Sequence, residues 1–249
     1  MSLMFGLKIL SKLNQKKYRQ EYGCFIVEGK KGVNDAIASG KEIIQLVMTR
    51  QFANLEKDFG NNQEILIVDE KDFAKLAETV TPSGIAAIVK MPNDTLETIK
   101  KTKLIAVLED IRDPGNLGTI IRTADWFGLD AVLLIGGADP YQPKVVRSSM
   151  GSIFHLPIVT SQNGEADLIE LKKAGFKIVV TRPELADSRK IVNFRDKTAI
   201  VFGNESKGTS KEIDQLADQS LSIPKHGHAE SLNVAVSFGI VINDLIKTR

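Results

Sequence analysis

The segment of residues 231–236 carries the strongest chemical signal in this chain. Two polar side chains, Ser231 and Asn233, open a helical pattern that is otherwise apolar almost all round. Such a helix must be buried on more than one side. The first N–H groups of a helix have no partners within it, so these groups and the Ser231 hydroxyl would face whatever the preceding loop of residues 223–230 encloses. The pattern predicts the wall of a ligand pocket.

A second loop, residues 203–210, follows an apolar run and is similar to the phosphate-binding P-loop of nucleotide hydrolases. In the P-loop the lysine comes directly after the second glycine, whereas here Lys207 precedes Gly208. Glu205 would also place a negative charge inside the phosphate cradle, which opposes phosphate binding. A nucleotide hydrolase is therefore kept only as a minor alternative.

A third loop, residues 109–116, leads into a helical pattern with an apolar stripe, and Arg122 lies off that stripe. Asn116 stands where a helix N-cap belongs. From this loop alone, a capping role and a functional role are equally open. Further along, Lys144 and Arg147 are spaced so that both could hold one phosphate, or both could decorate an exposed helix.

The composition excludes several classes of protein. The single cysteine, Cys24, allows no disulfide within the chain and no cysteine-based zinc site. His226 and His228 lack an obvious set of partner ligands, so we expect no metal. No apolar run approaches the roughly 18 residues that a membrane span needs. We therefore expect a cytoplasmic protein without membrane contacts.

The N-terminal region is basic, although the net charge of the whole chain is only +2. Residues 1–31 hold seven Lys or Arg side chains against two Glu side chains. This imbalance predicts a surface for a polyanion, with a merely solvated basic helix as the alternative. The candidate phosphate contacts are Lys12, Lys16, Lys17, Arg19 and Lys30.

Alternating strand and helix patterns position these loops. A break at residues 91–94 divides the chain into two predicted domains, 1–93 and 94–249. In the first, a small α/β domain, Asp69 is a candidate helix N-cap. In the second, strands are expected at residues 104–108, 131–134, 176–180, 199–202 and 221–223. This alternation predicts a mainly parallel sheet with helices on both faces and a ligand site beyond the carboxyl ends of its strands.

Three motifs, in order along the chain, carry a family resemblance. They are Asn116 with Arg122, then Gly203-Asn204-Glu205 with Gly208, then Ile223-Pro224 followed by Glu230-Ser231-Leu232-Asn233-Val234. From residue 104 to its C-terminus the chain resembles the SpoU (TrmH-like) RNA 2′-O-ribose methyltransferases of the SPOUT superfamily. Residues 144–157 are also similar to that family. Residues 11–37 resemble its N-terminal substrate-binding domain, which is ribosomal-protein-like in fold.

The resemblance implies a trefoil-knotted α/β domain that binds S-adenosylmethionine and methylates a ribosomal or transfer RNA. It also implies a homodimer whose active sites draw on both subunits. Arg122 would be the principal catalytic residue. The residues that would build the site around it are Asn116, Glu205, Ser231 and Asn233. The residues that would hold the cofactor are Gly203, Ile223, Leu232 and Thr181. Lys144 and Arg147 join the predicted RNA contacts.

The implied reaction is attack by a ribose 2′-hydroxyl on a sulfonium methyl, which needs the oxygen held in line more than it needs a strong acid. An arginine is a poor general base because almost none of it is neutral at pH 7. We therefore expect Arg122 to bind the adjacent phosphate and stabilise the developing alkoxide. The chain departs from the family pattern beside the cofactor loops, at Lys225, His226, Ser206 and Thr209. A non-catalytic RNA-binding protein on the same scaffold is the main alternative.

Overall fold

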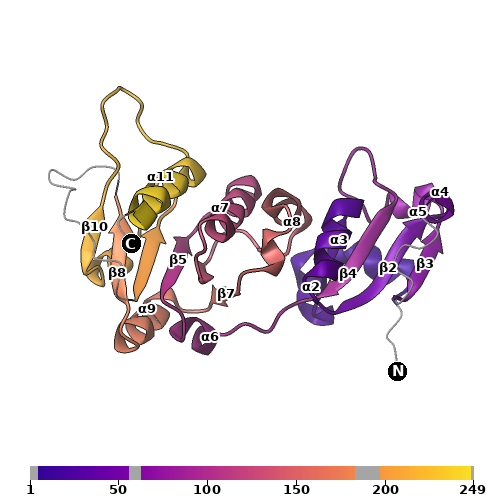
Figure 1. The fold of residues 1–249 in the computed structure, drawn as a ribbon, viewed down its shortest axis with the longest axis horizontal. Coiled ribbons are helices and arrows are strands. Elements are labelled where there is room, and N and C mark those ends of the chain that lie inside the picture. The colour runs from indigo at the N-terminus through magenta and orange to yellow at the C-terminus, as the bar shows by residue number, and fades with distance from the viewer. Residues whose placement is uncertain (1–4, 56–62, 183–196, 248–249) are drawn as a thin grey trace. The chain divides into compact units, whose positions relative to one another are not determined.

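The computed structural model describes residues 5–55, 63–182 and 197–247, which fall into two compact units. The first comprises Met1–Pro92 with Asp139–His155, and the second comprises Asn93–Ala138 with Leu156–Arg249. Each unit has its own sheet (Figure 1). By its contacts, the segment Asp139–His155 belongs to the first unit, whereas the sequence analysis assigned it to the C-terminal domain.

The first unit is built on a mixed four-stranded sheet with the order β1-β4-β2-β3. The strands β1 (Cys24–Glu28) and β2 (Ile43–Thr49) run antiparallel to β4 (Ile85–Lys90), and β3 (Ile65–Val68) runs parallel to β2. The helices described in this unit are α1 (Leu7–Leu10), the 3-10 helix η1 (Ser11–Asn14), α2 (Lys16–Tyr22), α3 (Lys30–Ala38), α4 (Arg50–Leu55), α5 (Glu70–Phe73), α8 (Pro143–Ser149) and the 3-10 helix η2 (Ser152–Phe154).

One apolar core lies within the first unit, and Cys24, Ile26 and Phe73 belong to it. The predicted cap Asp69 is confirmed, because its carboxylate accepts a hydrogen bond from the backbone N–H of Asp72 at 2.7 Å. This cap starts the short helix that carries Phe73 into the core. Burial raises the pKa of the Cys24 thiol to about 11. The thiol is therefore protonated at neutral pH and cannot act as a nucleophile.

The second unit is built on a six-stranded sheet with the order β10-β8-β9-β5-β6-β7. Every neighbouring pair is parallel, which confirms the predicted sheet. The strands are β5 (Leu104–Glu109), β6 (Ala131–Ile135), β7 (Ile158–Ser161), β8 (Lys177–Thr181), β9 (Thr198–Phe202) and β10 (Gln219–Leu221). The sequence analysis missed β7 because this edge strand has only two apolar residues, Ile158 and Val159, followed by two polar ones.

Helices cover both faces of the second sheet (Figure 1). On one face, Val201 of β9 lies in a core cluster with residues of α6 (Leu96–Lys100), α9 (Gly164–Lys173) and α10 (Lys211–Gln215). On the other face, the ring centroid of Phe202 lies 4.9 Å from that of Phe238 on α11. Helix α11 (Val234–Lys247) packs beside α7 (Pro114–Trp126). Successive strand residues point to opposite faces, so β9 joins the two layers. The trefoil knot stays a prediction.

Candidate active site

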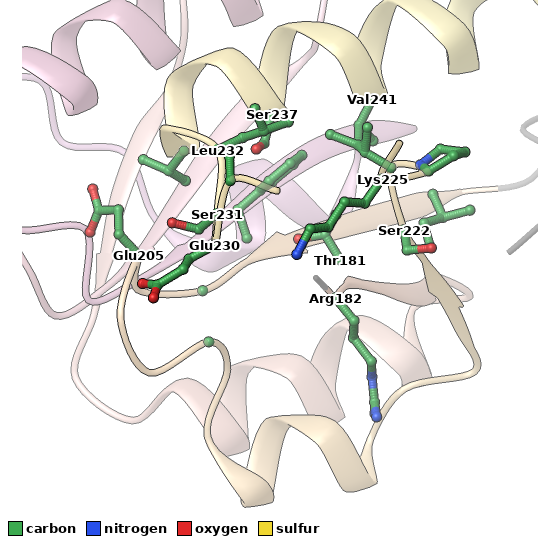
Figure 2. A pocket seen from close by; sticks show the side chains of 18 of the residues that line it. Thr181, Arg182, Glu205, Ser222, Lys225, Glu230, Ser231, Leu232, Ser237 and Val241 are labelled. Atoms are coloured by element: carbon green, nitrogen blue, oxygen red, sulfur yellow. The ribbon is translucent and has the colours of Figure 1, made fainter. Parts of the chain in front are cut away.

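A cavity of about 300 Å³ lies at the carboxyl ends of β8, β9 and β10 (Figure 2). Its walls come from the end of β8, from the loop after β9 and from the loop between β10 and α11. Ligands bind at this edge of open parallel sheets. The structure brings to this cavity all four predicted cofactor contacts and two of the predicted catalytic residues. They are Thr181, Gly203, Ile223, Leu232, Glu205 and Ser231.

The loop after β9 is closed by paired backbone hydrogen bonds. The N–H of Asn204 donates to the carbonyl of Gly208 at 3.0 Å, and the N–H of Gly208 donates back to Asn204 at 2.9 Å. Gly203 permits this closure, because a Cβ atom built on it would lie only 2.3 Å from the carbonyl carbon of Gly208. The loop is therefore closed around three residues, of which Glu205 is the first.

Two residues at the end of β5 hold this loop in place. Asp110 has a φ of 55°, in the left-handed region, and its carbonyl accepts a hydrogen bond from Asn204 Nδ2 at 3.0 Å. The Glu109 carboxylate accepts a hydrogen bond from the N–H of Ser210 at 2.9 Å. The sequence analysis gave no role to Glu109 or Asp110. Their partners are about 100 residues away, so no local pattern could have shown this anchoring role.

Three of the five predicted catalytic residues form one hydrogen-bonded chain. Asn116 Nδ2 donates to Glu205 Oε1 at 2.9 Å, and Asn233 Nδ2 donates to Asn116 Oδ1 at 3.0 Å. Asn233 Oδ1 in turn accepts from the backbone N–H groups of Ala235 and Val236. The start of α11 therefore fixes the orientation of both amides and aims the Asn116 amide at the Glu205 carboxylate.

The capping interpretation of Asn116 is wrong. Helix α7 begins at Pro114, and its N-cap is Asp113, whose carboxylate accepts a hydrogen bond from the backbone N–H of Asn116 at 2.8 Å. The local signal was present, because proline favours the first position of a helix and aspartate favours the N-cap. Since Asp113 caps the helix, the side chain of Asn116 is available for Glu205 and Asn233.

Arg122 is not brought to the cavity. It lies on α7 six residues beyond Asn116, which is about 9 Å along the helix axis at 1.5 Å per residue. Its side chain is exposed, and no hydrogen bond or ion pair joins it to any residue that the structure describes. The guanidinium is therefore available to a group outside this chain.

The structure contradicts the prediction that Arg19 contacts RNA. Its residue is 2% exposed, and its guanidinium donates to the carbonyls of Leu13 and Asn14 and to the Asp139 carboxylate, at 2.7, 2.8 and 2.7 Å. This arginine joins two segments of the first unit. Counting charges along the sequence could not reveal it, because the acidic partner is 120 residues away.

The structure also argues against the prediction that Lys144 and Arg147 hold one RNA phosphate between them. The guanidinium nitrogens of Arg147 lie 4.0 Å from Glu28 Oε2 and 3.9 Å from Glu78 Oε2. Two carboxylates therefore already balance the charge of Arg147, while Lys144 is exposed. A phosphate placed here would be repelled by Glu28 and Glu78.

The predicted lysine contacts Lys16, Lys17 and Lys30 are exposed, and Lys12 is half-buried. The ammonium groups of Lys12 and Lys17 lie 4.8 and 5.7 Å from the ring centroid of Tyr18. Helix α2 therefore combines cations with an aromatic ring on one surface, as nucleic-acid-binding surfaces commonly do. Their contact with RNA stays a prediction.

Sequence reasoning missed two charged residues of the cavity wall. Arg182 follows Thr181 at the end of β8, and Glu230 directly precedes Ser231. Lys225, noticed only as a departure from the family pattern, also lines the cavity. Glu230 stood within a quoted motif, so a charged residue directly before the predicted catalytic residue Ser231 was a signal that could have been used.

Some classes of site are not found in the described part of the chain. No group of three or more His, Cys, Asp or Glu side chains there could hold a metal ion. Among the described residues, no helix is both long and apolar enough to cross a membrane.

Comparisons with known proteins agree with this geometry. The SpoU rRNA Methylase family matches residues 103–243, and the MRM3-like substrate binding domain matches residues 6–87. A 23S rRNA (guanosine(2553)-2′-O)-methyltransferase of Bacillus subtilis is 36% identical, over 96% of this chain and 95% of its own length. A 23S rRNA (uridine(2479)-2′-O)-methyltransferase of Streptomyces viridochromogenes is 31% identical, over 95% of this chain and 87% of its own.

Solved structures give the same result. The SpoU methyltransferase AviRb of Streptomyces viridochromogenes, crystallised with its cofactor AdoMet, superposes with a TM-score of 0.87 and 29% identity, over 98% of this chain and 97% of its own. An AdoMet-bound rRNA methyltransferase from Sinorhizobium meliloti superposes with a TM-score of 0.84 and 34% identity, over 97% and 94% of the two chains. This chain belongs to the SpoU rRNA methylase family.

Proposed function

We propose that this protein transfers the methyl group of S-adenosylmethionine to a ribose 2′-hydroxyl of ribosomal RNA. The observation that carries the proposal is the chain of hydrogen bonds from Asn233 through Asn116 to Glu205, at the wall of a cofactor-sized cavity. A protein that only binds RNA has no use for this arrangement. The two relatives named above that act on 23S rRNA support ribosomal RNA over transfer RNA. The RNA substrate and the lone buried cysteine favour the cytoplasm.

The cavity fits S-adenosylmethionine in size and chemistry. About 300 Å³ is at the lower end for small-molecule sites. Phe202, Ile223 and Leu232 supply apolar wall for an adenine ring, and the glycines of the loop after β9 let a ligand approach the backbone closely. Charged side chains of both signs also line the cavity, as a ligand with a charged methionine end requires. When bound, the cofactor supplies an electrophilic methyl group on a sulfonium.

The residues of this chain orient the reacting oxygen and stabilise its charge. Glu205, held by Asn116, lies at the cavity wall, where a ribose would approach. The guanidinium of Arg122 stays charged, so it binds the neighbouring RNA phosphate with two N–H donors and stabilises the forming alkoxide. The hydroxyl proton leaves through that phosphate or through water, because Arg122 cannot accept it.

The position of Arg122 supports a homodimer in which it completes the partner subunit's site. Apolar side chains are exposed near it on the packed helices α7 and α11: Trp126 is 84% exposed, Val236 is 52% exposed and Ile240 is 37% exposed. Val236 and Ile240 are four residues apart and share one helix face. Burial of these side chains against a second copy would remove apolar surface from water and bring Arg122 to another cavity.

The function is tested by incubating the protein with S-adenosylmethionine and ribosomal RNA from cells that lack this chain, then mapping 2′-O-methylated nucleotides. We expect one new methylated position. If calorimetric titration finds no binding of S-adenosylmethionine, the non-catalytic RNA binder replaces the enzyme. Binding of ATP in its place would favour a nucleotide hydrolase.

Reversing the charges of Lys16 and Lys17 on α2 is expected to weaken RNA binding. If each lysine contacts one phosphate, Lys16→Glu with Lys17→Glu lowers the slope of log affinity against log salt by about 1.5 to 2, because each contact releases counterions. Affinity at low salt falls at least about tenfold. Filter binding or fluorescence anisotropy across a salt series measures both.

The matched control reverses two exposed lysines at the amino end of β5, Lys101→Glu with Lys103→Glu. This variant has the same net charge, but its changes lie at the opposite end of the strand from the cavity. Its salt slope should equal that of the unchanged protein. Equal losses in both variants would mean that α2 is a solvated surface and that only net charge matters.

A further inference from the structure

The charged side chains of the cavity are divided by sign. Figure 2 shows Glu205 and Glu230 on one side of the cavity, while the ammonium group of Lys225 reaches into it from the loop after β10. Arg182 also lines the cavity, but its guanidinium points away from Lys225 and lies 3.4 Å from the Asp214 carboxylate of α10. Of these two cations, Lys225 is therefore the one whose charged end reaches into the cavity.

The two glutamates also differ in their partners. Glu205 Oε1 accepts a hydrogen bond from Asn116. Glu230 has no hydrogen bond or ion pair with any described residue, and it lies next to Ser231 at the approach to α11. A negative group without a partner and a cation therefore border one cavity. This arrangement suits a ligand that carries both charges on adjacent atoms.

The amino-acid end of S-adenosylmethionine is such a ligand, since it carries an α-carboxylate and an α-ammonium on one carbon. We propose that Lys225 binds the α-carboxylate and Glu230 binds the α-ammonium of the cofactor. The inference rests on the proposed function. At position 225 the family pattern leads one to expect an apolar or small residue. The inference gives Lys225, which stands there instead, a role in cofactor recognition through a charged contact.

The test titrates three ligands into the protein by calorimetry: S-adenosylmethionine, its decarboxylated analogue, and 5′-methylthioadenosine, which lacks the whole amino-acid end. The unchanged protein should bind S-adenosylmethionine at least about tenfold more tightly than the decarboxylated analogue, as one charged hydrogen bond would give. Lys225→Met should abolish that preference by weakening S-adenosylmethionine alone. Glu230→Gln should weaken both ligands that carry the ammonium. Neither substitution should change the binding of 5′-methylthioadenosine.

The matched control is the substitution Lys207→Met. Lys207 is an exposed lysine on the loop after β9, and its side chain does not line the cavity. It should bind all three ligands like the unchanged protein. If Lys225→Met weakens both S-adenosylmethionine and its decarboxylated analogue equally, or weakens neither, the assignment of the carboxylate is wrong. An unchanged protein that binds both ligands equally overturns this inference alone. One that binds none of the three overturns the proposed function as well.

Discussion

Arg122→Lys is expected to lower the rate constant for methyl transfer at saturating RNA by about 100-fold or more, the loss that follows removal of one donor to a developing oxyanion. Lysine keeps the charge but lacks the planar pair of N–H donors that binds a phosphate at two points. Arg122 is exposed and has no partner among the described residues, so the fold should be unaffected. Single-turnover kinetics with excess enzyme measures the chemical step.

The control for this substitution is Arg112→Lys. Arg112 is also exposed, on the loop before α7, and its guanidinium lies 2.9 Å from the Asp110 carboxylate. The rate constant of this variant should stay close to that of the unchanged protein. If Arg122→Lys retained nearly full rate at saturating RNA, two-point recognition by Arg122 could not be essential, and the stabilisation of charge would have to come from elsewhere.

Mixing two inactive variants tests whether Arg122 acts in the partner subunit's site. Arg122→Ala and Glu205→Ala each damage a different part of the site. If the site draws on two subunits, an equal mixture refolded together forms heterodimers as half of all dimers, and each has one intact site, so about a quarter of the activity returns. If both residues act within one subunit, every site keeps a lesion and the mixture stays inactive.

The convergence of the three loops was predictable from the sequence because it depends on topology. Parallel strands share a carboxyl edge, so the loops after β5, β9 and β10 were expected at one edge of the sheet once the strands were recognised, and the strand order β10-β8-β9-β5 brings them close together. Contacts between distant residues were not predictable. The burial of Arg19 depends on Asp139, and the restraint on Arg147 depends on Glu28 and Glu78. No local period or spacing encodes such pairs.

The N-cap of α7 shows a different limit. Asn116 and Asp113 are both good capping residues, but the sequence analysis considered only Asn116 and left its capping and functional roles equally open. The side chain of Asn116 instead forms hydrogen bonds with Glu205 and Asn233, and these partners are 89 and 117 residues away in the sequence. Sequence reasoning therefore identified the residues of the site more reliably than their roles, because a role depends on which partner each side chain finds.

Gly203→Ala is expected to lower the affinity for S-adenosylmethionine by at least about 100-fold, a loss of roughly 2.7 kcal/mol. The added Cβ would lie 2.3 Å from the carbonyl carbon of Gly208 and 2.4 Å from the N of Thr209. These are backbone atoms, so no side-chain rotation can make room. The loop must open, and its paired hydrogen bonds and the position of Glu205 are lost with it. Overpacking of this kind should also cost about 1–3 kcal/mol of stability.

Gly227→Ala separates this effect from a general intolerance of the cavity to added bulk. Gly227 lines the same cavity, but a Cβ built on it meets no atom within 4 Å. Its affinity for S-adenosylmethionine should therefore stay within about threefold of the unchanged protein, well below 1 kcal/mol. Calorimetry at a temperature where both variants are folded by circular dichroism makes the comparison. Equal affinities in the two variants would mean that the closed form of the loop after β9 is not what holds the cofactor.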